Sequence, residues 1–176
     1  IIVVSIEFGW RRRKELSFRD IGFQQTGIGL LVMVAIAGFV LAGTIEGIER
    51  QLGIKPGDLV PELIAPQGFV WPHFVAVLIT VGVIAPIAEE MIFRGVLYSW
   101  FRSRFNIPLA IFLNAGLFGL IHFGYPLPLM ALVALMGAVF AWSFERTGSL
   151  WVPIVLHIGQ NSAVVIAVYA TLYFQR

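Results

Sequence analysis

The chain contains no cysteine and few charged residues. Without cysteine it can form no disulfide framework and can carry out no thiolate chemistry. Only 12% of its 176 residues are charged and 59% are hydrophobic, whereas soluble domains have about 25% charged and about 45–50% apolar residues. A surface of this composition cannot face water, so we expect membrane lipids around most of the protein. The net charge of +2 is small and the basic residues lie in short clusters, which excludes a nucleic-acid footprint.

Hydrophobic segments divide the chain into candidate membrane spans, because a bilayer core about 30 Å thick needs about 20 apolar residues in a helix. The segments are Thr26–Ile45, Phe74–Phe101, Ile107–His122, Leu127–Phe144 and Leu150–Phe174. Ile1–Phe8 is apolar but too short to span, and we interpret it as the end of a helix. Glu46–Pro72 mixes charges with Gly and Pro and predicts an interfacial loop, opening with a short amphipathic helix. The sequence therefore predicts one all-α domain over residues 1–176, a polytopic transmembrane helix bundle with about five full spans plus an N-terminal helix fragment.

The distribution of Lys and Arg predicts the orientation of the bundle, because cytoplasmic loops carry an excess of them. If residues 9–25 are cytoplasmic, the alternation of spans places eight basic residues on that side and three on the other. The eight are Arg11, Arg12, Arg13, Lys14, Arg19, Arg102, Arg104 and Arg146, and the three are Arg50, Lys55 and Arg176. We therefore expect a multi-pass integral membrane protein whose Arg-rich loops are cytoplasmic.

Glu89, Glu90 and Arg94 lie together inside the second span. A charged side chain at the bilayer centre costs at least about 2.5–3.5 kcal/mol on insertion scales, so each needs a partner. Glu90 and Arg94 are four residues apart on one helix face, in the order that favours an ion pair. Glu89 is rotated by about 100° from that face and is left for another purpose. The structural alternative is a packing ion pair beside one protonated, hydrogen-bonded Glu89.

Further polar residues fall inside the other spans. His122 ends one span, and His157 lies four residues before Asn161 in the last one. A single intramembrane histidine is often only hydrogen-bonded between helices. Two of them, with an amide and two carboxylates on three spans, are harder to explain as packing. We assign His73 an interfacial position without chemistry, and we expect Asn114 to form an interhelical hydrogen bond.

These side chains could hydrolyse a peptide bond. A carboxylate and an imidazole can hold and deprotonate a water between them, while a second imidazole and an amide can donate to the oxyanion. Glu89 and three partners, His122, His157 and Asn161, supply those parts without a Ser or Cys nucleophile. The other use of Glu89, His122 and His157 is a zinc site with water as a fourth ligand. The H-E-x-x-H spacing of zincins is absent, and the residues alone leave both uses open.

Three short motifs follow one another on separate hydrophobic spans. Glu89–Arg94 reads E-E-x-x-x-R, Phe118–His122 reads F-x-x-x-H, and His157–Asn161 reads H-x-x-x-N. In this order they resemble the CAAX protease and bacteriocin-processing (Abi) family, which includes the type II CAAX prenyl endopeptidase. The resemblance covers a motif core at residues 71–163. It implies an all-helical intramembrane glutamate protease without a metal cofactor.

The resemblance also implies roles for single residues. Glu89 would be the general base, with His122 helping to position and polarise the water. Glu90 would orient the site through Arg94. The remaining motif residues, His157 and Asn161, would form the oxyanion hole.

The substrate implied is a peptide or protein, with or without a lipid attached. Prenylated C-terminal peptides, bacteriocin precursors and signalling peptides are precedents in the family, and no residue here favours one of them. Two alternatives stay open. One is a zinc-dependent intramembrane protease with Glu89, His122 and His157 as ligands, and the other is a non-enzymatic membrane immunity or scaffold protein that holds a partner.

A single site sets a geometric condition on the bundle. At 1.5 Å per residue, His157 lies about 10 Å from the cytoplasmic end of its helix, Glu89 about 18 Å and His122 about 22 Å. These depths differ by more than side chains can bridge between upright helices. The sequence therefore predicts tilts of about 20° or more, or a Phe123–Pro126 turn sunk into the membrane.

Overall fold

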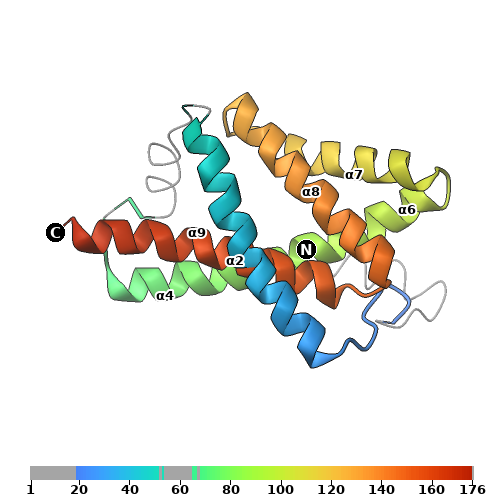
Figure 1. Ribbon diagram of the computed structural model, residues 1–176, viewed down its shortest axis with the longest axis horizontal. Helices are drawn as coiled ribbons and strands as arrows, with labels where there is room; N and C mark the ends of the chain where they lie inside the picture. Colours follow the sequence, from blue (N-terminus) through green and yellow to red (C-terminus); the bar gives the residue numbers. More distant parts are fainter. Residues whose placement is uncertain (1–18, 52, 54–64, 67, 176) are drawn as a thin grey trace.

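A computed structural model describes residues 19–51, 53, 65–66 and 68–175, and the regular structure in these ranges is entirely helical. The elements are α2 (Ile28–Gln51), α4 (Trp71–Ile79), η2 (Thr80–Ile84), α5 (Ala85–Glu90), η3 (Met91–Tyr98), α6 (Ser99–Arg102), α7 (Ile107–Leu120), α8 (Leu127–Thr147) and α9 (Trp151–Phe174). The predicted all-α bundle is confirmed (Figure 1). The predicted N-terminal fragment Ile1–Phe8 lies outside the described residues.

Four helices in the described part of the chain are long and apolar enough to cross a membrane: Ile28–Gln51, Trp71–Arg102, Leu127–Thr147 and Trp151–Phe174. The second of these joins α4, η2, α5, η3 and α6 in one continuous run. The protein is therefore an integral membrane protein. The fifth predicted span, α7, has only 14 residues, about 21 Å of helix against a hydrocarbon core of about 30 Å.

The Glu46–Pro72 segment opens with a helix, as predicted, but this helix is the continuation of α2 to Gln51 and not a separate element. Glu46 and Arg50 pair along this extension at a spacing of four residues, and such pairs support a helix even where the apolar pattern has ended. At the other end of the segment, α4 begins at Trp71, so the last two residues of the predicted loop are helical.

Local sequence explains where the shorter helices begin and end. The Asn106 side chain accepts a hydrogen bond from Leu109 N at 3.1 Å and caps the start of α7. The end of α8 is closed by Gly148, whose φ of 64° is readily adopted only by glycine. Its N–H donates to Phe144 O at 2.8 Å, which satisfies one of the last carbonyls of the helix.

The segment before α2 meets the α8–α9 turn and the end of α6 at one end of the bundle (Figure 1). Leu150 N donates to Gly22 O at 2.7 Å, which joins the first two of these parts. Arg102 Nε donates to Glu145 Oε2 at 3.1 Å, which ties α6 to the end of α8. The loops of the predicted cytoplasmic group that the structure describes are therefore neighbours in space.

Helices α2 and α9 cross with their backbones in contact (Figure 1). A Cβ atom on Gly38 would lie 2.4 Å from Leu156 O, and one on Gly159 would lie 2.6 Å from Ala35 O. Because no side chain fits at this crossing, small residues let the two helices approach as closely as membrane helices can. The crossing lies within the His157–Asn161 motif and fixes the position of α9.

Candidate active site

The two adjacent glutamates lie on α5, between two π-helical segments of the long second helix. In the first segment, Ala85 N–H donates to Thr80 O, one residue further back than in an α-helix. Pro86 then has no N–H to offer. The carbonyls of Val81 and Gly82 therefore lose their regular helical donors and need other partners.

Neighbouring residues on α9 supply the missing donors. Asn161 Nδ2 donates to Val81 O at 3.1 Å, and Ser162 Oγ donates to Gly82 O at 3.4 Å. These bonds hold α9 against the segment that leads into Glu89. Such π segments are frequent at functional sites, because they change the direction in which the following side chains point.

The second π segment, η3, is supported in the same way from α7. Asn114 is fully buried and its Nδ2 donates to Phe93 O at 2.8 Å. The predicted interhelical hydrogen bond of Asn114 is therefore confirmed. Both irregular stretches around α5 are thus bound by a side-chain amide from another helix.

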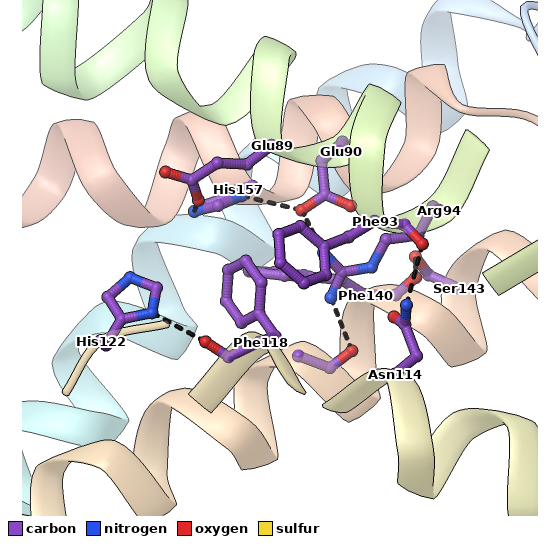
Figure 2. A network of polar contacts seen from close by, with 11 residues as sticks. Glu89, Glu90, Phe93, Arg94, Asn114, Phe118, His122, Phe140, Ser143 and His157 are labelled. Carbon is purple, nitrogen blue, oxygen red and sulfur yellow. Dashed lines mark hydrogen bonds and ion pairs between the residues drawn. The ribbon is translucent and has the colours of Figure 1, made fainter. Parts of the chain in front are cut away.

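Glu90 and Arg94 form an ion pair with both side chains fully buried. Arg94 Nη1 lies 2.8 Å from Glu90 Oε1, and Nη2 donates to Gly137 O of α8 at 2.7 Å. The guanidinium carbon lies 4.7 Å and 5.3 Å from the ring centres of Phe118 and Phe140 (Figure 2). The predicted ion pair is confirmed, and cation–π contacts add to it.

His157 connects the two glutamates. Its Nδ1 lies 2.9 Å from Glu90 Oε1, and its Nε2 lies 3.8 Å from Glu89 Oε2. Because a carboxylate paired with Arg94 only accepts, Nδ1 carries the proton and Nε2 faces Glu89. The ring also stacks on Phe140, with centroids 4.6 Å apart and planes at 24° (Figure 2). Glu90 therefore contacts His157 directly, beyond the contact with Arg94 that the sequence predicted.

Glu89 differs from its neighbour in exposure and in partners. Its side chain is 28% exposed, whereas that of Glu90 is fully buried. The distance of 3.8 Å to His157 is too long for a hydrogen bond. The Glu89 carboxylate therefore lies near the His157 imidazole without a hydrogen bond to it, and it can bond another partner.

His122 follows the end of α7 and approaches from the opposite side. Its Nδ1 donates to Phe118 O at 2.8 Å, which leaves Nε2 for the site. The Phe118 ring lies 5.2 Å from the His122 ring and 5.9 Å from the His157 ring. Figure 2 shows the rest of the His122 ring turned toward the Glu89 carboxylate, and the two groups interact electrostatically. The last turn of α7 thus faces η3 and α9 through Phe118, whose ring contacts the rings of Phe93 and His157.

Two other predicted polar residues take different positions. Asn161 lies one turn after His157 on α9, and one of its two amide hydrogens is engaged by Val81 O. Within the part of the chain that the structure describes, its other N–H has no hydrogen bond. His73 lies in the first turn of α4 and takes no part in the site. Its ring packs against the Tyr169 ring, with centroids 6.3 Å apart.

No group of three histidine or acidic residues in the described part of the chain is close enough together to hold a metal ion.

Sequence reasoning missed the contributions of Phe140, Gly137 and Ser162. Phe140 stacks on the His157 ring, and the carbonyl of Gly137 accepts a hydrogen bond from Arg94. Ser162 donates to the carbonyl of Gly82. An apolar ring or a glycine inside a hydrophobic span carries no signature of such a role. The only available signal was Ser162, a polar residue adjacent to Asn161.

The family model of type II CAAX prenyl endopeptidase Rce1-like proteins matches residues 71–163. The matched segment is more than half of the chain and contains α5, the end of α7 and the first half of α9. The chain belongs to this Rce1-like family. The three motifs of this Rce1-like protein all lie inside the matched residues.

Two curated relatives were found for the Rce1-like chain. The Bacillus subtilis (strain 168) protein named "Putative membrane peptidase YdiL" is 31% identical over 145 residues, which cover 81% of this chain and 59% of the relative. The Escherichia coli protein named "Uncharacterized 24.3 kDa protein" is 27% identical over 134 residues, covering 74% of this chain and 58% of the relative. The chain thus spans about three fifths of the length of the curated relatives it matches. No solved structure gives a significant match.

Proposed function

We propose that this Rce1-like protein is an intramembrane endopeptidase in which Glu89 and His122 activate the water that attacks the peptide bond. The observation that carries the proposal is the contrast between the two glutamates. Glu90 is fully buried with Arg94 and His157, whereas Glu89 is partly exposed and faces the imidazoles of His157 and His122. The peptidase named among the relatives and the family description support the same reaction class.

In the proposed first step, Glu89 takes a proton from a water that His122 Nε2 helps to hold. The water oxygen bonds to the carbonyl carbon of the substrate, and the electrons of the C=O bond move to the oxygen. In the second step the oxyanion re-forms the C=O bond, the C–N bond breaks, and Glu89 returns the proton to the leaving amine, which leaves a carboxylic acid and an amine as products. General base catalysis of this kind contributes about 10²–10⁴-fold to a rate.

His157 Nε2 and the remaining N–H of Asn161 are the proposed donors to the oxyanion. His157 already donates from Nδ1 to Glu90. It can donate from Nε2 only as an imidazolium, and the buried Glu90 carboxylate stabilises that charge. A donor of this type contributes about 2.7–4 kcal/mol in known cases.

The proposed substrate is a peptide or protein, with or without a lipid attached, that reaches the site from the surrounding membrane. The proposed orientation places the end of the bundle that carries Arg19, Arg102, Arg104 and Arg146 in the cytoplasm, with the active site opening to that side. The proposed reaction uses no metal cofactor, and the protein needs no nucleic-acid partner.

The test is cleavage of a quenched fluorescent peptide library, lipidated and unlipidated, by purified protein in detergent. Wild type, Glu89→Gln and His122→Ala are compared, each with and without a chelator. Glu46→Gln is the matched control, since Glu46 lies far along α2, is 46% exposed and pairs only with Arg50 among the described residues. We expect chelator-resistant cleavage that falls by about 10²-fold or more in both site variants and stays unchanged in the control.

The other outcomes point to different functions. Loss of cleavage on chelation, restored by zinc, would indicate the zinc-dependent protease. Equal cleavage by wild type and by Glu89→Gln would mean a contaminating protease and would remove the support for the activity. A scaffold or immunity protein would keep its partner in the Glu89→Gln variant, which a pull-down would reveal.

A further inference from the structure

Tyr125 lies in the turn between α7 and α8, three residues after His122. Its ring stacks on the His122 ring, with centroids 5.8 Å apart and planes at 25°. Its backbone N–H donates to His122 O at 2.9 Å, which closes the turn and holds the two residues together. Tyr125 is therefore attached to His122 through both its backbone and its ring.

The ring of Tyr125 is also anchored in the protein. It is half-buried and packs against the main core cluster, which includes Phe118. The neighbouring Phe123 is 82% exposed and Gly124 is exposed as well. Tyr125 is thus the aromatic residue of this turn that is directed into the bundle.

Tyr125 also lies within electrostatic range of the proposed general base. Burial, and after it the negative charge of Glu89, raises the pKa of the Tyr125 hydroxyl. The tyrosine therefore lies against the His122 ring and close enough to Glu89 for the charge of that carboxylate to act on it.

We propose that Tyr125 is a positioning residue whose ring fixes the plane of the His122 imidazole, so that Nε2 stays turned toward Glu89. One hydrogen bond, from Nδ1 to Phe118 O, holds only one atom of the imidazole. This hydrogen bond alone would still allow the His122 ring to rotate about it. The Phe118 ring, 5.2 Å away and tilted by 58°, and the stacked Tyr125 ring restrict this movement. The inference rests on the proposed function for its catalytic consequence and on the stacking alone for its structural part.

The kinetic test compares Tyr125→Leu, which removes the aromatic ring, with Tyr125→Phe, which keeps it. Phe123→Leu is the matched control in the same turn. A small misplacement of a catalytic group lowers the rate of the chemical step strongly. We expect Tyr125→Leu to lower kcat about tenfold with little change in KM, and Tyr125→Phe to stay within about twofold of wild type. Tyr125→Leu with the activity of Phe123→Leu would overturn the proposal.

An NMR measurement tests the stacking independently of activity. In protein labelled at histidine, the His122 ring resonance is identified by its absence in His122→Ala. The ring current of Tyr125 should shift this resonance, so Tyr125→Leu should move it and Tyr125→Phe should largely preserve it. An unmoved resonance in Tyr125→Leu would overturn the proposal. A wild type that cleaves no substrate would count against the proposed function, and the resonance would then decide the role of Tyr125 by itself.

Discussion

At the scale of single residues, Glu89 and Glu90 are adjacent and identical in chemistry but differ in surroundings. Glu90 lies among Arg94, His157 and the core, with both carboxylate and guanidinium fully buried. Glu89 is partly exposed, and its carboxylate lies 3.8 Å from His157 Nε2. Substitution by Gln at each position therefore tests a structural role for Glu90 and a catalytic role for Glu89.

Glu90→Gln should destabilise the protein, and Glu89→Gln should not. Without the Glu90 charge, Arg94 becomes an uncompensated cation inside the membrane, and breaking a buried pair in this way costs about 3–5 kcal/mol. Thermal unfolding in detergent, followed by the loss of helical circular dichroism, is the measurement. We expect a clearly lower Tm for Glu90→Gln and a Tm close to wild type for Glu89→Gln. Equal melting of the two variants would show that the buried pair does not stabilise the fold.

Contacts set by spacing along one helix could be predicted from the sequence, and contacts between helices could not. The Glu90–Arg94 pair follows from a separation of four residues, and it is present. The direct contact between Glu90 and His157 depends on how α5 and α9 pack, which no local pattern encodes. Asn114 was predicted to bond another helix because a buried amide must find a partner, but the partner itself, Phe93 O, was not predictable.

At the scale of elements, the second span shows how an irregular helix is tolerated in lipid. A proline in the middle of a helical pattern usually indicates a kink or an end. The run nevertheless continues from Trp71 to Arg102, and side chains of α9 bind the two carbonyls that the π segment and Pro86 leave without helical donors. The sequence gives the proline and the polar pair Asn161–Ser162, but only the packing of the two helices connects them.

The contact between α2 and α9 predicts which glycines of α2 can be replaced by alanine without loss of stability. Gly38→Ala should lower the free energy of unfolding, because its Cβ would lie 2.4 Å from Leu156 O, and overpacking of this kind costs about 1–3 kcal/mol. Gly43→Ala is the matched control on the same helix, with nothing within 4 Å of its added Cβ. Thermal unfolding in detergent should show a lower Tm for Gly38→Ala only. A Tm for Gly38→Ala equal to that of Gly43→Ala would contradict the close crossing.

At the scale of the whole molecule, hydropathy predicted the number and order of the helices well, since lipid demands long apolar helices. It was less informative about α7, whose apolar stretch reads as a span although the helix stops at Leu120. A Gly/Pro-containing turn can end a helix at the membrane surface or inside the bundle, and composition does not distinguish the two. The position of His122, and therefore the geometry of the site, depends on where this turn lies relative to the bundle.

The proposed orientation can be tested with single cysteines, because the chain has none of its own. Ser103→Cys lies in an exposed turn at the basic end, and Gln51→Cys lies at the exposed end of α2. A membrane-impermeant thiol reagent should modify Ser103→Cys from the cytoplasmic face and Gln51→Cys from the opposite face. Labelling of right-side-out and inside-out vesicles distinguishes these outcomes, and the reverse pattern would show that the protein is inserted the other way round.

The crossing of α2 and α9 bears on where the autonomous folding unit begins. The segment shared with the family starts at Trp71, after α2 has ended. Yet α2 touches the backbone of α9 at Gly159, between His157 and Asn161. A polypeptide that began at Trp71 would keep every motif residue but would leave Gly159, which lies between two of them, without its contact to α2. The helix that carries His157 and Asn161 is therefore packed against a helix outside the segment that identifies the family, and a fragment limited to that segment would lack this support.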